Sequence, residues 1–189
     1  MPATQEAINT FVINAHGNMA GVKEMLAEDP DLINTRSNLD ETPLGAASHV
    51  GNRAMAEYLL SQGAELDFPA AVMLGRTAWV TSILDADPSL AQSAGVHGIS
   101  VLFHAVVGGN LEMVQLLIER GADITSVAGP DATALNAAAW RGDEPMAAWL
   151  IEQGASADVP DFEGKTALQR AEENGHESIA AMMRDATEQ

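Results

Sequence analysis

Apolar residues recur at helical spacing along the chain, in short stretches of two alternating kinds. In one kind the residues are small, as in residues 135–139 (LNAAA). In the other the apolar side chains are bulky, as in residues 113–118 (MVQLLI). Apolar positions three and four residues apart are typical of one face of an α-helix. The pattern therefore predicts a series of helix pairs, each with a small-residue first helix and a bulkier second helix.

A glycine followed by Asn, Asp or His separates the two helices of each pair. Successive glycines are 34, 24, 34, 33 and 33 residues apart. A period of this length is typical of a repeat protein, in which each unit shares its core with its neighbours. The glycines are Gly17, Gly51, Gly75 (a weaker member, followed by Arg), Gly109, Gly142 and Gly175.

Capping residues keep the same register. Thr42, Ser100, Thr133 and Thr166 each precede a first helix, where a side-chain oxygen can accept hydrogen bonds from unpaired backbone N–H groups. Glycines such as Gly121 follow the second helices, because glycine tolerates the left-handed conformation that ends a helix. Turn residues come next, and they suit a hairpin.

These features resemble the ankyrin repeat over about residues 5–184. The resemblance rests on Thr42-Pro43-Leu44 with Ala46-Ala47 and Gly51, and on Gly121-Ala122-Asp123 after Leu116-Leu117. It implies an all-α ankyrin-repeat solenoid of stacked helix-turn-helix units with short β-hairpin fingers. We expect a single domain over residues 1–189. Its six repeats are predicted at about 4–34, 35–67, 68–92, 93–125, 126–158 and 159–186.

The third repeat departs from the pattern. Its first helix, predicted at residues 68–74, follows Gly63 so soon that no room is left for a finger. We therefore expect a notch in the row of fingers between the second and fourth repeats. Loops 38–41 and 96–99 would form its walls, and Met73 and Leu74 would form its floor.

Composition narrows the classes of partner. The chain has 9 Lys and Arg against 27 Asp and Glu, a net charge of −18, with no basic cluster. We therefore expect no nucleic-acid partner, whereas a basic protein would be attracted. No apolar run approaches the ~18 residues of a membrane span, and residues 1–6 do not begin a secretory signal. We expect a cytoplasmic monomer that does not bind membranes. Cysteine is absent, which excludes disulfides and thiolate metal sites.

The positions through which ankyrin proteins usually bind are the finger tips and the exposed end of the inner helix. In this chain these positions are unexpectedly apolar, and a contiguous exposed apolar patch usually marks a binding site. A Trp beside an Arg is typical of an interface hot spot. The alternative is that the fingers fold inward and these residues pack on one another. The predicted partner-binding residues are Leu39, Glu41, His49, Val50, Met73, Leu74, Val96, His97, Ile99, Val107, Trp140, Arg141 and Phe162.

Sequence motifs that indicate catalysis are absent. There is no nucleotide-binding glycine pattern, no His-Glu-x-x-His zinc pattern and no serine with an evident His–Asp pair. We therefore expect no cofactor and assign no catalytic or metal-ligating residue. His16 and His176 are expected to be structural or solvated, and Trp79 and Trp149 are expected to pack in the core.

Two functions remain open at this point. The favoured one is a protein-binding scaffold that recognises its partner through the concave face, without enzyme activity. The alternative is a small-molecule-binding or catalytic protein that uses the notch. In that case His49, His97 and His104 would meet beside Met73 and Leu74, and could bind a metal ion or act as general bases.

Overall fold

A computed structural model describes residues 3–126, 133–161 and 163–187 of the chain. Over these residues it contains twelve α-helices, arranged as six helix–turn–helix pairs, and no β-sheet. The predicted all-α solenoid is therefore confirmed. The pairs are α1 Gln5–Ala15 with α2 Met19–Glu28, α3 Pro43–His49 with α4 Arg53–Ser61, α5 Phe68–Met73 with α6 Thr77–Ala86, α7 Val101–Val107 with α8 Leu111–Glu119, α9 Ala134–Arg141 with α10 Glu144–Glu152, and α11 Ala167–Glu173 with α12 Glu177–Thr187.

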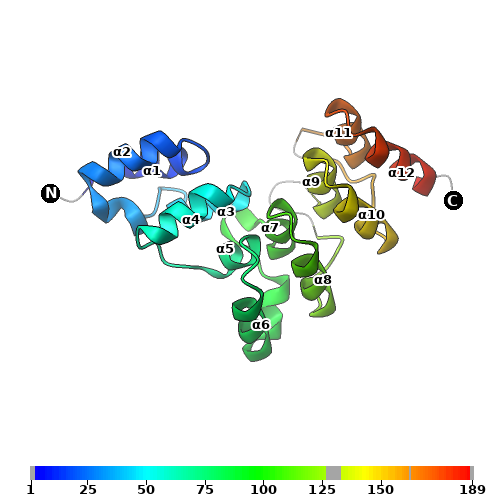
Figure 1. The fold of residues 1–189 in the computed structure, drawn as a ribbon, viewed down its shortest axis with the longest axis horizontal. Helices are drawn as coiled ribbons and strands as arrows, with labels where there is room; N and C mark the ends of the chain where they lie inside the picture. Colours follow the sequence, from blue (N-terminus) through cyan, green and yellow to red (C-terminus); the bar gives the residue numbers. More distant parts are fainter. Residues whose placement is uncertain (1–2, 127–132, 162, 188–189) are drawn as a thin grey trace.

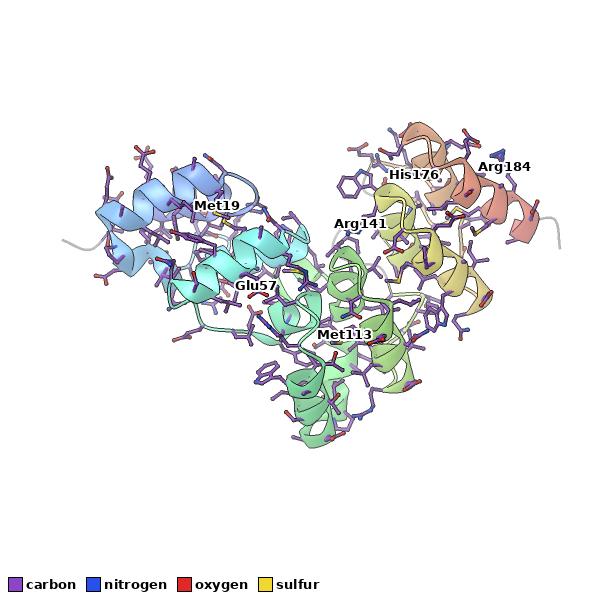
Figure 2. The ribbon with its side chains drawn as sticks, viewed as in Figure 1. Met19, Glu57, Met113, Arg141, His176 and Arg184 are labelled. Atoms are coloured by element: carbon purple, nitrogen blue, oxygen red, sulfur yellow. The ribbon has the colours of Figure 1, made fainter. Side chains whose placement is uncertain are left out.

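The six pairs form a bent row, with the two termini at its ends and α6 and α8 on its outer side (Figure 1). The first helices of the pairs contact one another in the order α1, α3, α5, α7, α9 and α11. Side chains fill the space between pairs, and the buried Met113 of α8 is one example (Figure 2). Within the described residues, no helix has both the length and the apolar character needed to cross a bilayer.

The predicted caps explain where four of the inner helices begin. The side chains of Thr42, Ser100, Thr133 and Thr166 accept hydrogen bonds from backbone N–H groups at the starts of α3, α7, α9 and α11. Each such cap contributes about 1 kcal/mol to helix stability. Local residue choice therefore fixes the entry into the inner helices.

The loops before α3, α7 and α11 turn back on themselves like hairpins. The backbone N–H of Gly95 donates to the carbonyl of Ile99 at 2.8 Å, and that of Asp161 donates to the carbonyl of Lys165 at 2.8 Å. Within the described ranges, however, β pairing is limited to one isolated bridge between Ala94 and Ser100. The fingers that the structure describes before α3 and α7 are thus tight turns, too short to make a ladder.

The gap expected at the short third repeat is closed by contacts between its neighbours. α3 contacts both α5 and α7. A Cβ atom on Gly51 would lie 2.4 Å from the carbonyl oxygen of Val107, and one on Gly108 would lie 2.2 Å from that of Met73. Only glycine allows the backbones to approach this closely. The second, third and fourth pairs therefore meet in one tight seam, formed by Gly51, Met73, Val107 and Gly108.

Candidate functional site

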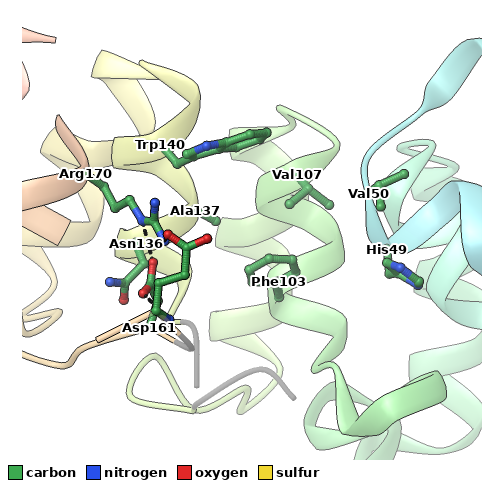
Figure 3. A pocket seen from close by; sticks show the side chains of 10 residues that line it. His49, Val50, Phe103, Val107, Asn136, Ala137, Trp140, Asp161 and Arg170 are labelled. Carbon is green, nitrogen blue, oxygen red and sulfur yellow. Dashed lines mark hydrogen bonds and ion pairs between the residues drawn. The ribbon is translucent and has the colours of Figure 1, made fainter. Parts of the chain in front are cut away.

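A groove of about 400 Å³ opens on the inner side of the bent row, between α3 and α7 on one side and α9 and α11 on the other. Figure 3 shows Trp140 of α9 on one wall, with Phe103 and Val107 of α7 and then Val50 and His49 across from it. Polar groups around Arg170 lie on the same side as Trp140, at the end away from Val50 and His49. The groove is lined by His49, Val50, Phe103, Val107, Asn136, Ala137, Trp140, Asp161, Glu163 and Arg170.

The exposed apolar side chains of the groove follow from how α9 packs. Its alanines, including Ala138 and Ala139, are buried between the neighbouring inner helices. Trp140 comes next on the helix and points away from that contact, so that 55% of the residue is exposed. Leaving so large an aromatic surface in water is costly, and such surfaces commonly mark interaction sites.

The structure places the predicted binding residues in different environments. Leu39, Val50, His97, Trp140 and Arg141 are exposed, and His49, Val96 and Ile99 are partly exposed. Glu41 and Val107 are buried, although Val107 still lines the groove. Phe162 lies outside the described residues. Ile13 is also exposed, although it was not among the predicted binding residues.

Met73 and Leu74 are buried, which corrects the expectation that they form an open floor. The guanidinium of Arg53 donates to the carbonyl of Leu74 at 2.8 Å and to that of Met73 at 3.2 Å, and so caps the end of α5. Gly108 covers Met73 from the side of α7. Neighbouring repeats therefore contact the backbone of the third repeat, and the side chains of Met73 and Leu74 are not accessible to a partner.

A smaller cavity of about 220 Å³ lies where the third finger is missing, and Arg36, Asp67, Pro69, Val96 and His104 are among the residues that line it. Burial lowers the pKa of His104 to about 4, although a hydrogen bond from its Nδ1 to the carbonyl of Ser100, at 2.9 Å, opposes the shift. His104 is therefore neutral at pH 7 and held by its own helix.

Three other histidines surround one buried carboxylate. Oε1 of Glu41 lies 3.1 Å from Nδ1 of His49, 3.5 Å from Nε2 of His97 and 3.8 Å from Nε2 of His16. The ring centroid of His49 is 4.9 Å from that of His16 and 5.9 Å from that of His97. We call these four residues the histidine cluster. It contains His49 and His97, as one hypothesis required, but His16 takes the place expected for His104.

The elements around the histidine cluster come from three repeats. His16 caps the C-terminus of α1, Glu41 precedes the N-cap of α3, and His49 ends α3. His97 lies in a tight turn with a positive φ of 60°. The Glu41 side chain is only 5% exposed. This burial raises the pKa of Glu41, but the contact with His49 and the attraction of the imidazoles in their protonated form outweigh it, so the pKa lies below the ordinary value.

The last finger is held by a buried ion pair at the polar end of the groove. Asp161 accepts hydrogen bonds from the backbone N–H of Glu163 at 2.9 Å and of Lys165 at 3.1 Å, and from Nε of Arg170. Burial raises the pKa of Asp161, but these hydrogen bonds and the charge of Arg170 lower it below the ordinary value overall. Arg170 also pairs with Glu163 at 3.0 Å. The groove therefore has a fixed wall on this side.

We expect Asp161→Asn to lower the free energy of unfolding at pH 7 by about 2 kcal/mol, because it leaves Arg170 without its buried partner. Since the folded-state pKa is lowered, the stabilisation by Asp161 is present above its unfolded pKa of about 4 and is lost as the pH falls through the folded value. Urea unfolding at several pH values should show the difference shrinking below about pH 4. The exposed Asp31 provides a control, and Asp31→Asn should change little. An Asp161→Asn effect equal to that of the control would show that the ion pair does not stabilise the finger.

Comparisons with known sequences agree with this architecture. A family profile described as Ankyrin repeats (3 copies) matches residues 70–161 and 102–188, and one described as Ankyrin repeat matches residues 39–71. Together these matches cover most of the chain.

Similar proteins carry such repeats within much longer chains. Ankyrin repeat and SAM domain-containing protein 6 of Mus musculus is 35% identical over 108 residues, which is 57% of this chain and 10% of the mouse protein. Ankyrin repeat protein nuc-2 of Neurospora crassa is 31% identical over 126 residues, or 62% of this chain and 12% of that protein. The chain thus spans about a tenth of the length of these relatives. With the profile matches and the stacked helix pairs, these similarities show that the chain belongs to the ankyrin-repeat family.

Proposed function

We propose that this chain is a protein-binding scaffold that holds its partner in the groove on the inner side of the bent row. Ankyrin repeats in general mediate protein–protein binding. The observation that supports this groove is the exposed indole of Trp140, which stands opposite Val50 and Val107 (Figure 3). Trp is enriched among the few residues that contribute most of the binding energy at interfaces.

The groove favours a partner segment that combines an apolar side chain with basic neighbours. Phe103, Val107 and Trp140 provide an apolar surface, while Glu163 provides a carboxylate at the rim. The net charge of −18 would attract a basic segment over long distances. Arg141, which is exposed on the inner side beside Trp140, can pair with an acidic group or a backbone carbonyl of the same partner (Figure 2).

The test begins with affinity purification of the chain's partner from the native host and its identification by mass spectrometry. With the purified partner, Trp140→Ala should raise the Kd by about 10- to 100-fold, because an interface Trp commonly contributes 2 kcal/mol or more. Calorimetric titration would measure the Kd, and circular dichroism would confirm that the variant keeps its helices.

Trp79 is the matched control, because it lies on the outer helix α6, is 38% exposed and does not line the groove. We expect Trp79→Ala to leave the Kd unchanged. An unchanged Kd for Trp140→Ala, or an equal loss for both variants, would show that the partner does not bind in this groove.

A further inference from the structure

We propose that His16, Glu41 and His49 form a binding site for a divalent transition-metal ion of the zinc type. The site would join the turn after α1 to both ends of α3, with His97 of the fourth repeat beside it. This goes beyond partner binding, because it gives the histidine cluster a ligand of its own.

The spacing of the side chains fits a small metal ion. His16, Glu41 and His49 each offer one ligand atom, and these atoms all lie within 4.8 Å of one another. Nδ1 of His49 and Nε2 of His16 lie 3.1 Å and 3.8 Å from Oε1 of Glu41. Zinc binds nitrogen and oxygen at about 2.0–2.2 Å, so two ligands of a tetrahedral ion lie roughly 3.3–3.6 Å apart. Small side-chain movements would therefore complete the geometry.

Two of the candidate ligand atoms lack hydrogen-bond partners. Oε1 of Glu41 and Nδ1 of His49 are both buried, and neither has a hydrogen-bond partner within the described part of the chain. They lie 3.1 Å apart, but the contact does not have hydrogen-bond geometry. A buried polar atom without a partner is costly, most of all on a charged group. A cation between the two atoms would satisfy both.

The orientation of His16 points to the same conclusion. Its Nδ1 lies 3.1 Å from the carbonyl oxygen of Val12 and 3.2 Å from that of Ile13. Because a carbonyl only accepts hydrogen bonds, Nδ1 must carry the proton, and in the neutral ring Nε2 then presents a lone pair toward Glu41. Histidines that bind metals commonly donate their second nitrogen to a carbonyl or carboxylate in this way, which fixes the tautomer.

The ligand set and its accessibility indicate the class of ion. Two imidazoles and one carboxylate suit zinc and its transition-metal neighbours, whereas magnesium and calcium prefer oxygen ligands alone. The side chains of His16 and His97 are 36% and 35% exposed, so an ion can reach the buried carboxylate from solvent. His97 lies beside the three ligands, with its Nε2 3.5 Å from the same oxygen of Glu41.

The test is a calorimetric titration of the full chain, without a histidine tag and after treatment with a chelator, with Zn²⁺ alone. We expect one zinc ion to bind per chain. Glu41→Gln and His49→Gln should each weaken binding by roughly 100-fold or more, because loss of a ligand costs at least as much as loss of its supporting contacts. Zn²⁺ should also raise the thermal midpoint of the wild-type chain but not that of Glu41→Gln. His97→Gln should still bind one ion.

His176→Gln is the matched control, because His176 lies at the turn before α12, in another part of the bent row (Figure 2). It should bind zinc as the wild type does, and circular dichroism would show that each variant is folded. Three results would overturn the proposal: no stoichiometric uptake by the folded wild type, wild-type affinity in Glu41→Gln and His49→Gln, or loss of the ion in His97→Gln. The first two results would mean that the histidine cluster binds no metal ion and is held by contacts between protonated histidines and Glu41.

The result of the zinc titration does not depend on whether the proposed protein partner binds in the groove. Trp140→Ala, which tests the groove, leaves all three proposed ligands in place and should bind zinc normally. A failure of the zinc titration would therefore leave the scaffold proposal standing, and a failure of the groove test would leave the metal site standing.

Discussion

Met73→Asp is expected to lower the free energy of unfolding by about 4 kcal/mol or more, which is most of the stability of a domain at the low end of the usual range of about 5–15 kcal/mol. Met73 has no exposed surface, Arg53 donates a hydrogen bond to its carbonyl, and Gly108 packs closely against its backbone. An aspartate there would be buried without a designated partner for its charge. Urea unfolding followed by circular dichroism would measure the loss.

Leu39→Asp is the control for this substitution. Leu39 is 66% exposed in the finger of the second repeat, so a carboxylate at that position remains in water. We expect its unfolding midpoint to match that of the wild type. If Met73→Asp instead unfolded at the same midpoint as Leu39→Asp, the tight seam between the third and fourth repeats would not exist in solution.

The fold could be predicted because its determinants are local. The hydroxyl groups of Thr42, Ser100, Thr133 and Thr166 each act within one turn of their own helix, so the sequence alone indicated where these helices begin. The period of glycines then indicated how many units follow one another. Neither inference required knowledge of how closely the units approach.

The candidate site was harder to predict because it depends on how closely neighbouring repeats approach one another. The missing third finger indicated a gap, and Met73 and Leu74 were expected to lie open beneath it. Instead, the second and fourth repeats lie against each other at this point, and α3 contacts α7 directly. The Gly108-Gly109 pair carried a signal for this closure, since a glycine before the turn glycine leaves room for another backbone. Only the structure shows that the backbone of Met73 occupies the space beside Gly108.

Long-range pairing also explains two other differences. His16 resembled an ordinary turn residue, but the finger of the next repeat brings Glu41 to it. Trp79 was expected in the core and is 38% exposed. Its helix α6 packs on α5 and on the short 3-10 helix Pro88–Gln92, which leaves one side of the indole in solvent. The ring centroid of Trp79 lies 6.3 Å from that of Phe68.

Gly108→Ala is the second substitution with a large expected effect. The φ of Gly108 is −71°, which any residue adopts, so the cost comes from packing alone. A Cβ atom would lie 2.2 Å from the carbonyl oxygen of Met73 and 3.0 Å from its carbonyl carbon. Backbone atoms cannot move aside as a flexible side chain can, so we expect a loss of about 3 kcal/mol in the free energy of unfolding.

Gly17→Ala provides the comparison for Gly108→Ala. A Cβ atom on Gly17 meets nothing within 4 Å, and its φ lies outside the left-handed region. This variant should keep wild-type stability or gain a few tenths of a kcal/mol, because alanine reduces the entropy of the unfolded chain. Equal unfolding midpoints for the two variants would contradict the close contact between α5 and α7.

The same pair of variants connects the seam to the histidine cluster. His97 belongs to the fourth repeat and Glu41 to the second, so their 3.5 Å contact depends on how closely these two repeats approach each other at the seam. If Gly108→Ala spreads the seam without unfolding the chain, His97 should move away from Glu41 while His16 and His49 remain beside it. Nuclear magnetic resonance of the histidine rings would then show a changed environment for His97 in Gly108→Ala and an unchanged one in Gly17→Ala. An unchanged environment for His97 in a folded Gly108→Ala would mean that the cluster is held together within its own loops and does not depend on the seam.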